Sequence, residues 1–341
     1  MKAFKLIPEN VPIAPCCRRN RELVHKMIIT FHGRFVTDEL RGMIIFMQNY
    51  ILSCCSTADL TEEHFKARDI RYICFNYMLD GIAYSDDLGK SMPFDRFYKA
   101  MADGAETTTS QVNVDEFTAY FTPLLEAGQD VLHICFSSGL SGSCNSAMIA
   151  RNELLEIYPD RKLYIVDSLA ASSGYGLLMD KVADLRDEGM GIDDLYAWVN
   201  ENKLRLHHWF FSTDLTFYIK GGRVSKTSGF VGTLLGICPL LNMDNNGKLV
   251  PRTKIRGKKN VIKLIVEKME ECADDGLCYD GKCYISNSAC VEDAQAVAAM
   301  VKDHFPRLCG DVEIYSIGTT IGSHTGPGTV ALFFWGKPRN D

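Results

Sequence analysis

Positive charge is in deficit in this sequence of 341 residues. Its 37 Lys and Arg residues stand against 43 Asp and Glu residues, which leaves a net charge of −6. No run of Lys or Arg reverses that balance locally, because even the most basic stretch, residues 252–259, is more simply explained as the solvated edge of a hairpin. The charge therefore argues against a nucleic-acid-binding protein.

Long apolar runs are also missing. The first 20 residues contain Pro8, Pro12 and Pro15 and no continuous apolar core, so they do not form a secretory signal. Residues 27–47 are apolar in places but carry several charged side chains, which excludes a conventional membrane span. We expect an amphipathic pair of helices in residues 1–48 instead.

Cysteine is plentiful, with 13 residues, but the spacings typical of metal or redox sites are absent. The adjacent pairs 16–17 and 54–55 lack the C-x-x-C spacing, and Cys278 with Cys283 has no second pair. An odd number of cysteines in apolar surroundings indicates reduced thiols that serve as small core residues. We therefore expect a cytoplasmic protein with no metal and no cofactor.

Two catalytic motifs are nearly present but incomplete. Residues 222–227 contain Lys-Thr but lack the glycine before the lysine and the spacing of a phosphate-binding P-loop. Ser141 has Gly139 two residues before it, yet Ser143 stands where a nucleophile elbow requires a second glycine. A hydrolase triad could still form from a serine, His324 and an aspartate, although no candidate base lies at a recognisable sequence distance from the serine.

The most informative stretch is a turn rich in serine and glycine, residues 136–147. It follows the apolar residues 131–135 and precedes apolar residues at helical spacing, so we expect a strand, a turn and a helix. The glycines let the backbone approach a ligand closely, and the hydroxyls and the helix start suit a phosphate or a carboxylate. The alternative is that the serines only cap the helix and close the turn.

The order of predicted elements indicates an α/β protein in two domains. In residues 49–206, strands near 50–52, 70–75, 131–136 and 163–166 alternate with helices, which predicts a parallel sheet. Ligands of such sheets bind at the carboxyl ends of the strands, where the turns after Leu52, Phe136 and Val166 would gather.

The remaining residues, 207–341, read as an α+β domain with a mixed sheet. Asn246-Gly247 between apolar runs predicts a hairpin over residues 239–255. We expect helices at 261–273 and 292–304, strands at 283–286, 312–317 and 330–335, and a glycine-rich helix at 227–238.

Two further residues stand in unusual surroundings. His324 lies among glycines and a proline, so we expect it in a loop, where it either stabilises a turn or acts at a site. Arg223 follows two glycines and is either an exposed charge or a cation aimed at an anion.

Taken together, these segments resemble the DegV family, the fatty-acid-binding proteins that include the FakB subunit of bacterial fatty acid kinase. The resemblance covers roughly residues 49–335. It rests on five segments in the family's order: Ser-Thr-Ala-Asp-Leu at 56–60, Thr-Ser-Gln at 109–111, Ser-Ser-Gly-Leu-Ser-Gly at 137–142, Gly-Gly-Arg-Val-Ser-Lys at 221–226 and Gly-Ser-His-Thr-Gly-Pro-Gly at 322–328.

The resemblance implies a protein that buries a long-chain fatty acid in a tunnel and has no catalytic activity of its own. It implies that Thr109 and either Ser137 or Ser138 hold the carboxylate, and that Ser141, Arg223 and His324 line the head-group region. A separate ATP-dependent kinase subunit would phosphorylate the bound carboxylate for phospholipid synthesis, and contact with a membrane would be transient.

The sequence departs from the family pattern at three places. Cys55 stands where the family usually has Asp, and residues 112–114 replace the prolines that commonly follow Thr-Ser-Gln. Residues 1–48 have no counterpart in short members. Two other functions stay open: a serine-dependent acyl hydrolase or transferase, and a regulatory protein that senses lipid.

Overall fold

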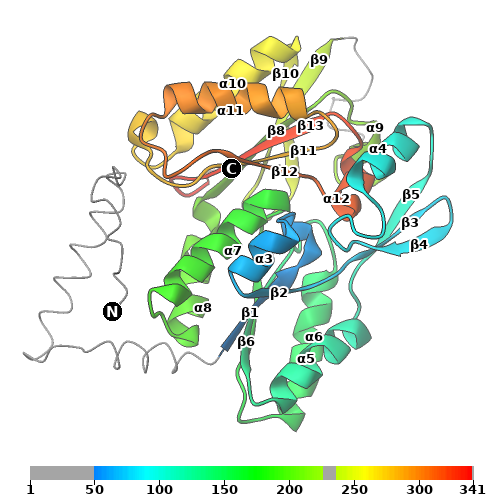
Figure 1. Cartoon of the computed structure of the whole chain (residues 1–341), viewed down its shortest axis with the longest axis vertical. Coiled ribbons are helices and arrows are strands. Elements are labelled where there is room, and N and C mark those ends of the chain that lie inside the picture. Colours follow the sequence, from blue (N-terminus) through cyan, green and yellow to red (C-terminus); the bar gives the residue numbers. More distant parts are fainter. Residues whose placement is uncertain (1–49, 226–235, 340–341) are drawn as a thin grey trace, which may run out of the picture. The chain divides into compact units, whose positions relative to one another are not determined.

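The computed structural model describes residues 50–225 and 236–339 (Figure 1). The predicted helical extension, residues 1–48, and most of the predicted glycine-rich helix, residues 227–238, lie outside these ranges. Within them, no helix is both long enough and apolar enough to cross a bilayer.

A parallel four-stranded sheet has the strand order β2-β1-β6-β7. Its strands are β1 (Tyr50–Cys55), β2 (Ile70–Ile73), β6 (Asp130–Cys135) and β7 (Leu163–Asp167). The helices around it are α3 (Glu62–Ala67), α5 (Val114–Glu126), α6 (Ser143–Ile157), α7 (Ser172–Asp187) and α8 (Ile192–Asn202). Strands β1 and β6 are almost wholly buried, as a parallel sheet covered on both faces requires. The predicted parallel sheet is confirmed.

The turns that follow these strands meet at one edge of the sheet, as predicted. The amide of Ser137, after β6, donates to the carbonyl of Ala170, after β7, at 3.1 Å. The 3₁₀ helix η1 (Ser56–Ala58) follows β1 directly. The serine turn therefore lies between two other polar turns.

A small antiparallel sheet, in the order β4-β3-β5, was predicted only in part. It contains β3 (Asn76–Leu79), β4 (Ile82–Ser85) and β5 (Thr107–Ser110), and α4 (Phe94–Ala102) lies between β4 and β5 in the chain. Residues 77–90, which contain Asp80-Gly81, predict a loop or a hairpin, and the hairpin β3-β4 lies there. Residues 106–111 predict a hydroxyl-rich segment too polar for the core, so strand β5 differs from the prediction. Threonine suits a strand because it is β-branched, and β5 needs to bury only one face.

The larger sheet is mixed, as predicted, and has the order β10-β9-β8-β13-β11-β12. Only β11 and β12 run parallel; the other neighbours are antiparallel. Its strands are β8 (Leu206–Ser212), β9 (Ile237–Met243), β10 (Leu249–Arg256), β11 (Tyr284–Asn287), β12 (Glu313–Ser316) and β13 (Thr329–Trp335). The hairpin β9-β10 confirms the Asn-Gly prediction.

Helices cover both faces of the larger sheet (Figure 1). One face packs on α10 (Lys258–Cys272) and α11 (Val291–His304), and the other packs on α7. Strand residues alternate accordingly, because Phe211 and Leu332 belong to the core with α10 and α11 while Phe210 and Phe333 join the core around α7. Helix α7 therefore links the two larger sheets. The predicted boundary between residues 206 and 207 stays a prediction.

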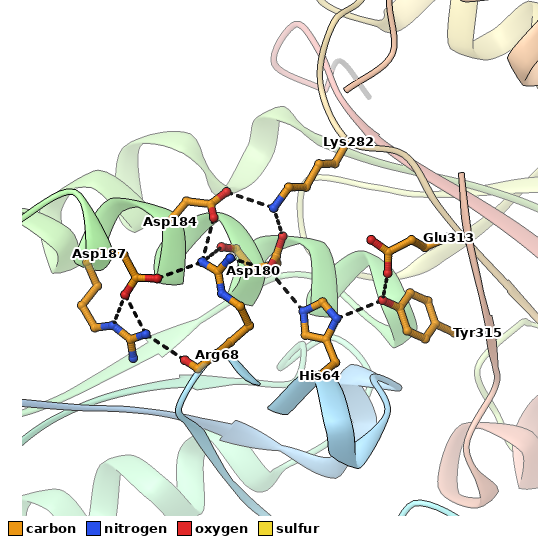
Figure 2. Close-up of polar contacts among 9 residues, drawn as sticks. His64, Arg68, Asp180, Asp184, Asp187, Lys282, Glu313 and Tyr315 are labelled. Carbon is orange, nitrogen blue, oxygen red and sulfur yellow. Dashed lines mark hydrogen bonds and ion pairs between the residues drawn. The ribbon is translucent and has the colours of Figure 1, made fainter. Parts of the chain in front are cut away.

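A network of charged side chains reinforces this link (Figure 2). Asp180 on α7, with a side chain only 2% exposed, contacts Lys282 before β11, His64 at 3.2 Å and Arg68 at 3.5 Å. Asp184, one turn later, accepts from Arg68 at 2.7 Å and from Lys282 at 3.1 Å. Burial alone would raise the pKa of Asp180, but hydrogen bonds from His64 and Lys282 and the charge of Arg68 hold it well below its usual range.

The network continues into β12 through Tyr315, whose hydroxyl donates to Glu313. The same hydroxyl oxygen lies 3.2 Å from Nδ1 of His64, and Nε2 of His64 faces Asp180 (Figure 2). Side chains from α3, α7, β12 and the segment before β11 are thus joined in one polar chain.

The other short elements are α9 (Thr216–Lys220), α12 (Thr319–Thr325), η2 (Lys203–Arg205) and η3 (Gly276–Cys278). Helix α12 corrects the expectation that His324 lies in a loop, because this residue occupies its last turn. The helix ends at Gly326, whose φ of 63° turns the chain away.

Candidate functional site

A cavity of about 320 Å³ is lined by strands of the small and the larger sheet and by residues that follow strands of the parallel sheet. Its volume is within the range of small-molecule sites in proteins, roughly 300 to 1,000 Å³. Most of the wall is apolar, and aromatic rings contribute much of it. The apolar lining comprises Phe75, Phe136, Leu140, Ala171, Phe210, Tyr218, Met243, Leu249, Ile317, Ile321, Ala331 and Phe333.

Four of the residues singled out in the sequence line this cavity together: Thr109, Ser141, Arg223 and His324. We call them the polar cluster. They come from β5, the serine turn, the segment after α9 and α12, which are far apart in the chain. The fold thus gathers two hydroxyls, a cation and an imidazole beside an apolar chamber, as a carboxylate with a long tail requires.

The contact between Thr109 and His324 is the centre of the polar cluster. The hydroxyl oxygen of Thr109 lies 2.8 Å from Nε2 of His324. The other ring nitrogen, Nδ1, is buried and has no hydrogen-bond partner among the described residues. It packs against Gly221, where a Cβ atom would lie 2.3 Å away, so only glycine fits.

This arrangement indicates which nitrogen of His324 carries the proton. Burial, together with the charge of Arg223, lowers the pKa of His324 to about 4, so the ring is neutral at pH 7. A proton on Nδ1 would leave a buried N–H without an acceptor, which costs more than an unpaired acceptor. We infer that Nε2–H donates to Thr109, which leaves the threonine hydrogen free to donate into the cavity.

Ser143 orients the hydroxyl of Ser141 in a similar way, by donating hydrogen bonds to its oxygen. The hydroxyl of Ser143 accepts the amide of Val112 at 3.0 Å and lies 3.0 Å from the hydroxyl of Ser141. The backbone N–H of Ser143 also points at the Ser141 oxygen, at 3.3 Å. The Ser141 oxygen therefore accepts from its own turn, and its hydrogen remains available for an anion.

Arg223 supplies the positive charge of the cluster. Its Nη1 donates to the carbonyl of Gly221 at 2.5 Å, and its Nη2 donates to the carbonyl of Leu140 at 3.1 Å. Burial lowers the pKa of the guanidinium, but arginine stays charged in proteins. The side chain therefore ties the serine turn to the segment after α9 and places a cation beside His324.

Ser137 and Ser138 lie elsewhere. The Ser137 hydroxyl is fully buried, donates to the carbonyl of Gly247 at 2.8 Å and accepts the amide of Gly139 at 3.2 Å. Ser138 is exposed, and its amide donates to Asp167 at 3.1 Å. Neither is among the described residues that line the cavity. Their contact with a carboxylate stays a prediction, whereas Ser141, the later hydroxyl of the turn, faces the cavity.

Among the other polar residues of the wall, Gln111 and Tyr218 have no role predicted from the sequence. Gln111 lies two residues after Thr109 and donates to Ser146 on α6 at 3.0 Å, so strand periodicity would have placed it beside Thr109. Tyr218 donates or accepts at Thr329 at 2.9 Å, and no local pattern marks it because its role depends on how α9 packs against β13.

No group of three or more His, Cys, Asp or Glu side chains in residues 50–225 and 236–339 is arranged to hold a metal ion. Cys54, Cys135 and Cys238 are buried thiols outside any disulfide bond.

Comparison with known proteins agrees with the geometry. A family model described as "Uncharacterised protein, DegV family COG1307" matches residues 55–337. A DegV domain-containing protein of Clostridium perfringens is 38% identical over 293 residues, which cover 86% of this chain and 99% of that protein.

Two solved structures share the fold. A DegV family protein from Thermus thermophilus, described by its fatty acid binding, is 25% identical with a TM-score of 0.75, over 85% of this chain and all of that one. The Streptococcus pneumoniae fatty acid kinase B3 protein, solved with linoleic acid, is 20% identical with a TM-score of 0.73, over 85% of this chain and 100% of that chain.

Proposed function

The chain belongs to the DegV family, and from that premise we propose that its cavity holds a long-chain fatty acid whose carboxylate is presented to a separate ATP-dependent kinase. The observation that carries this proposal is the polar cluster at the wall of an apolar cavity. Residues 49–206 would supply most of the head-group contacts, and residues 207–341 would complete the tunnel.

Thr109 and Ser141 are the best-placed donors for the carboxylate. Both oxygens accept hydrogen bonds from the protein, so both hydroxyl hydrogens are left to donate. Arg223 is available to compensate the negative charge, since within the described residues its guanidinium contacts go to two backbone carbonyls and to no carboxylate. Hydrogen bonds to a charged group contribute roughly 1.5 to 3 kcal/mol each.

The tail supplies most of the affinity in this proposal. A chain of about sixteen carbons, buried at ~0.8 kcal/mol per methylene, contributes on the order of 10 kcal/mol before ordering costs. The polar cluster then fixes where the head group lies, and the aromatic lining accommodates the chain.

Phosphorylation requires a partner because this chain carries no phosphate-cradling motif. The shared fold with the S. pneumoniae fatty acid kinase B3 protein supports a kinase subunit as that partner. We propose that the chain itself is a cytoplasmic carrier without catalytic activity, in which the cysteines stay reduced.

Native mass spectrometry of the protein purified from cells tests the proposal. We expect a non-covalent adduct with the mass of a long-chain fatty acid, released by organic extraction at about one per chain. Several independent preparations without stoichiometric lipid, and no uptake of added fatty acid, would overturn the carrier function.

A further inference from the structure

Helix α12, which carries His324 in its last turn, is held at its first turn by two buried carboxylates. Asp86, 1% exposed, accepts from the Thr319 hydroxyl at 2.8 Å and lies 3.4 Å from the backbone N–H of Thr320. Asp59, 6% exposed, approaches the same place, because a Cβ atom on Gly318 would be 2.6 Å from its Oδ1 and 3.4 Å from Oδ1 of Asp86. Both carboxylates therefore converge on the residue that begins the helix.

Neither carboxylate has an ion-pair partner among the described residues. The titratable groups that face them are each other and Tyr98, whose hydroxyl donates to the carbonyl of Ile317 at 2.8 Å. Cys74 and Tyr77 also face Asp86. Two anions so close together in a buried site without a cation repel each other strongly, so the pair shares a proton.

The hydrogen-bond partners indicate which carboxyl carries that proton. Asp59 lies 2.5 Å from the hydroxyl of Ser172, which in turn lies 2.9 Å from the hydroxyl of Ser286. When Asp59 is ionised, the Ser172 hydroxyl and the Gly318 N–H donate to it. When Asp59 is protonated, Ser172 accepts from it and passes its own hydrogen to Ser286.

The oxygens of Asp86 face donors instead. The Ser56 hydroxyl accepts the amide of Phe75 at 3.1 Å, so its hydrogen points at Asp86, 3.4 Å away. The Thr319 hydroxyl and the Thr320 amide complete the set. Asp86 is therefore the anion of the pair, placed at the positive end of the first turn of α12.

We propose that Asp86 is a positioning residue for the polar cluster: as an anion it anchors the start of α12 and thereby holds His324 against Thr109, while a neutral Asp59 packs beside it against Gly318. The residues between these two ends also line the cavity, since Thr320, Ile321, His324 and Thr325 all face it. The effect on ligand affinity rests on the proposed function, whereas the effect on His324 does not.

The electrostatics agree with this assignment. Burial raises the pKa of Asp59 well above its ordinary value, and the charge of Asp86 raises it further. Burial also raises the pKa of Asp86, but hydrogen bonds from the first turn of α12 oppose that effect.

Two isosteric variants test the assignment. Asp86→Asn removes the negative charge and replaces one of the two acceptor oxygens with an NH2 group, so the first turn of α12 loses at least one hydrogen bond to a charged group. In Asp59→Asn, the amide can donate to Ser172 as the protonated acid does. Asp87→Asn is the matched control, because Asp87 is the next residue but its carboxylate caps the amides of Lys90 and Ser91.

Two readouts are measured for each variant: titration of the His324 imidazole by NMR, and affinity for a fluorescent long-chain fatty acid. In Asp86→Asn we expect the pKa of His324 to move up toward its ordinary value and the affinity to fall roughly tenfold, the size of one lost hydrogen bond to a charged group. Asp87→Asn should leave both unchanged, and Asp59→Asn should stay within about twofold of the parent affinity.

The proposal is wrong if Asp86→Asn leaves the His324 titration at its parent value, or if Asp59→Asn shifts it as much. Should Asp86→Asn fail to fold, Thr319→Val removes one hydrogen bond to Asp86 with little change of shape and should move His324 in the same direction. If the parent protein binds no fatty acid, the proposed function fails, but the titration of His324 still decides the role of Asp86.

Discussion

The imidazole Nε2 of His324 lies 2.8 Å from the hydroxyl oxygen of Thr109, although the two residues are 215 positions apart in the chain. The contact joins α12 to β5 at the polar wall of the cavity. In this contact the imidazole donates to the threonine oxygen, so the threonine hydroxyl can donate its own hydrogen to an anion in the cavity.

Removing the Thr109 hydroxyl should weaken carboxylate binding more than tail binding. Thr109→Ala loses one hydrogen bond to a charged group, roughly 1.5 to 3 kcal/mol, or about ten- to a hundredfold in affinity for a fatty acid. Thr109→Ser should retain most of the affinity.

Thr108→Ala is the control for the same strand, because Thr108 lies on the exposed face of β5. Displacement of a fluorescent fatty acid measures all three variants, and the fatty alcohol of equal length should bind the parent and Thr109→Ala almost equally. Equal affinity of the parent and Thr109→Ala for the acid would place the carboxylate elsewhere.

The local pattern of the sequence was enough to predict most of the fold. Apolar runs followed by Ser/Gly-rich turns predicted the parallel strands β6 and β7 and the turns that gather at their carboxyl ends. Asn246-Gly247 predicted the hairpin β9-β10, because that dipeptide suits a tight turn whatever surrounds it.

The parts that were missed depend on contacts between distant segments. Strand β5 contains three threonines whose strand conformation is set by pairing with β3, as in Tyr77 opposite Thr109. Helix α12 has the sequence Thr-Thr-Ile-Gly-Ser-His-Thr, which favours helix poorly, and it forms where Asp86 and the packed wall of the cavity hold it. Which serine of the turn faces the cavity, Ser137, Ser138 or Ser141, likewise depends on the direction of each side chain. The spacing of the serines in the sequence does not define that direction.

The folded protein should lose stability in a defined acid range because of His324. Its pKa is lowered to about 4, so the folded state binds fewer protons than the unfolded state between about pH 4 and 6.5. The free energy of unfolding therefore falls as the pH is lowered from about 6.5 to about 4. Below about pH 4, His324 causes no further change. The loss is on the order of 2 kcal/mol after allowance for the partial exposure of the ring.

Urea unfolding at several pH values, compared with His324→Gln, isolates this effect because all other groups titrate in both proteins. We expect the two stability curves to converge as the pH falls from 6.5 to 4. Parallel curves would show that His324 has the same pKa in the folded and the unfolded protein, which would contradict the prediction. A bound fatty acid should protect the parent by raising the pKa of His324, and the uncharged methyl ester should not.

The network around Asp180 should dominate the stability of the contact between α7 and the larger sheet. Asp180→Asn removes the more deeply buried of the two carboxylates that Lys282 and Arg68 share, while Asp184 still contacts both cations. The lost charge-assisted contacts should cost about 1.5 to 3 kcal/mol. The pKa of Asp180 is depressed in the folded state, so its contribution is present above about pH 4 and is lost as the pH falls below that value.

Asp103→Asn is the control, because its pair with Lys99 is exposed and should contribute only about 0.5 kcal/mol. Urea midpoints at pH 7 and pH 3 measure both variants. Asp180→Asn should be far less stable than the parent at pH 7 and closer to it at pH 3. A change no larger than that of Asp103→Asn would mean that the network in Figure 2 contributes little.

The last prediction concerns whether the chain catalyses anything alone. Ser141 faces the cavity, but its hydroxyl contacts the hydroxyl and amide of Ser143, and the nearest imidazole nitrogen in the polar cluster is already engaged by Thr109. A serine nucleophile needs a base within hydrogen-bond reach, and in the described part of the chain no hydrogen bond joins Ser141 to His324. We therefore expect no cleavage of acyl esters or thioesters by the isolated protein, with or without ATP.

The kinase-dependent reaction distinguishes a fatty-acid carrier from an acyl hydrolase. With a kinase subunit present, His324→Ala should reduce acyl phosphate formation, because it removes the donor that orients Thr109 against the carboxylate. Ser141→Ala should reduce it as well, by the loss of one donor to the same group. Hydrolysis by the protein alone that disappears in both variants would instead identify Ser141 as a nucleophile with His324 as its base, and the chain as an acyl hydrolase whose cavity holds a substrate rather than a carried ligand.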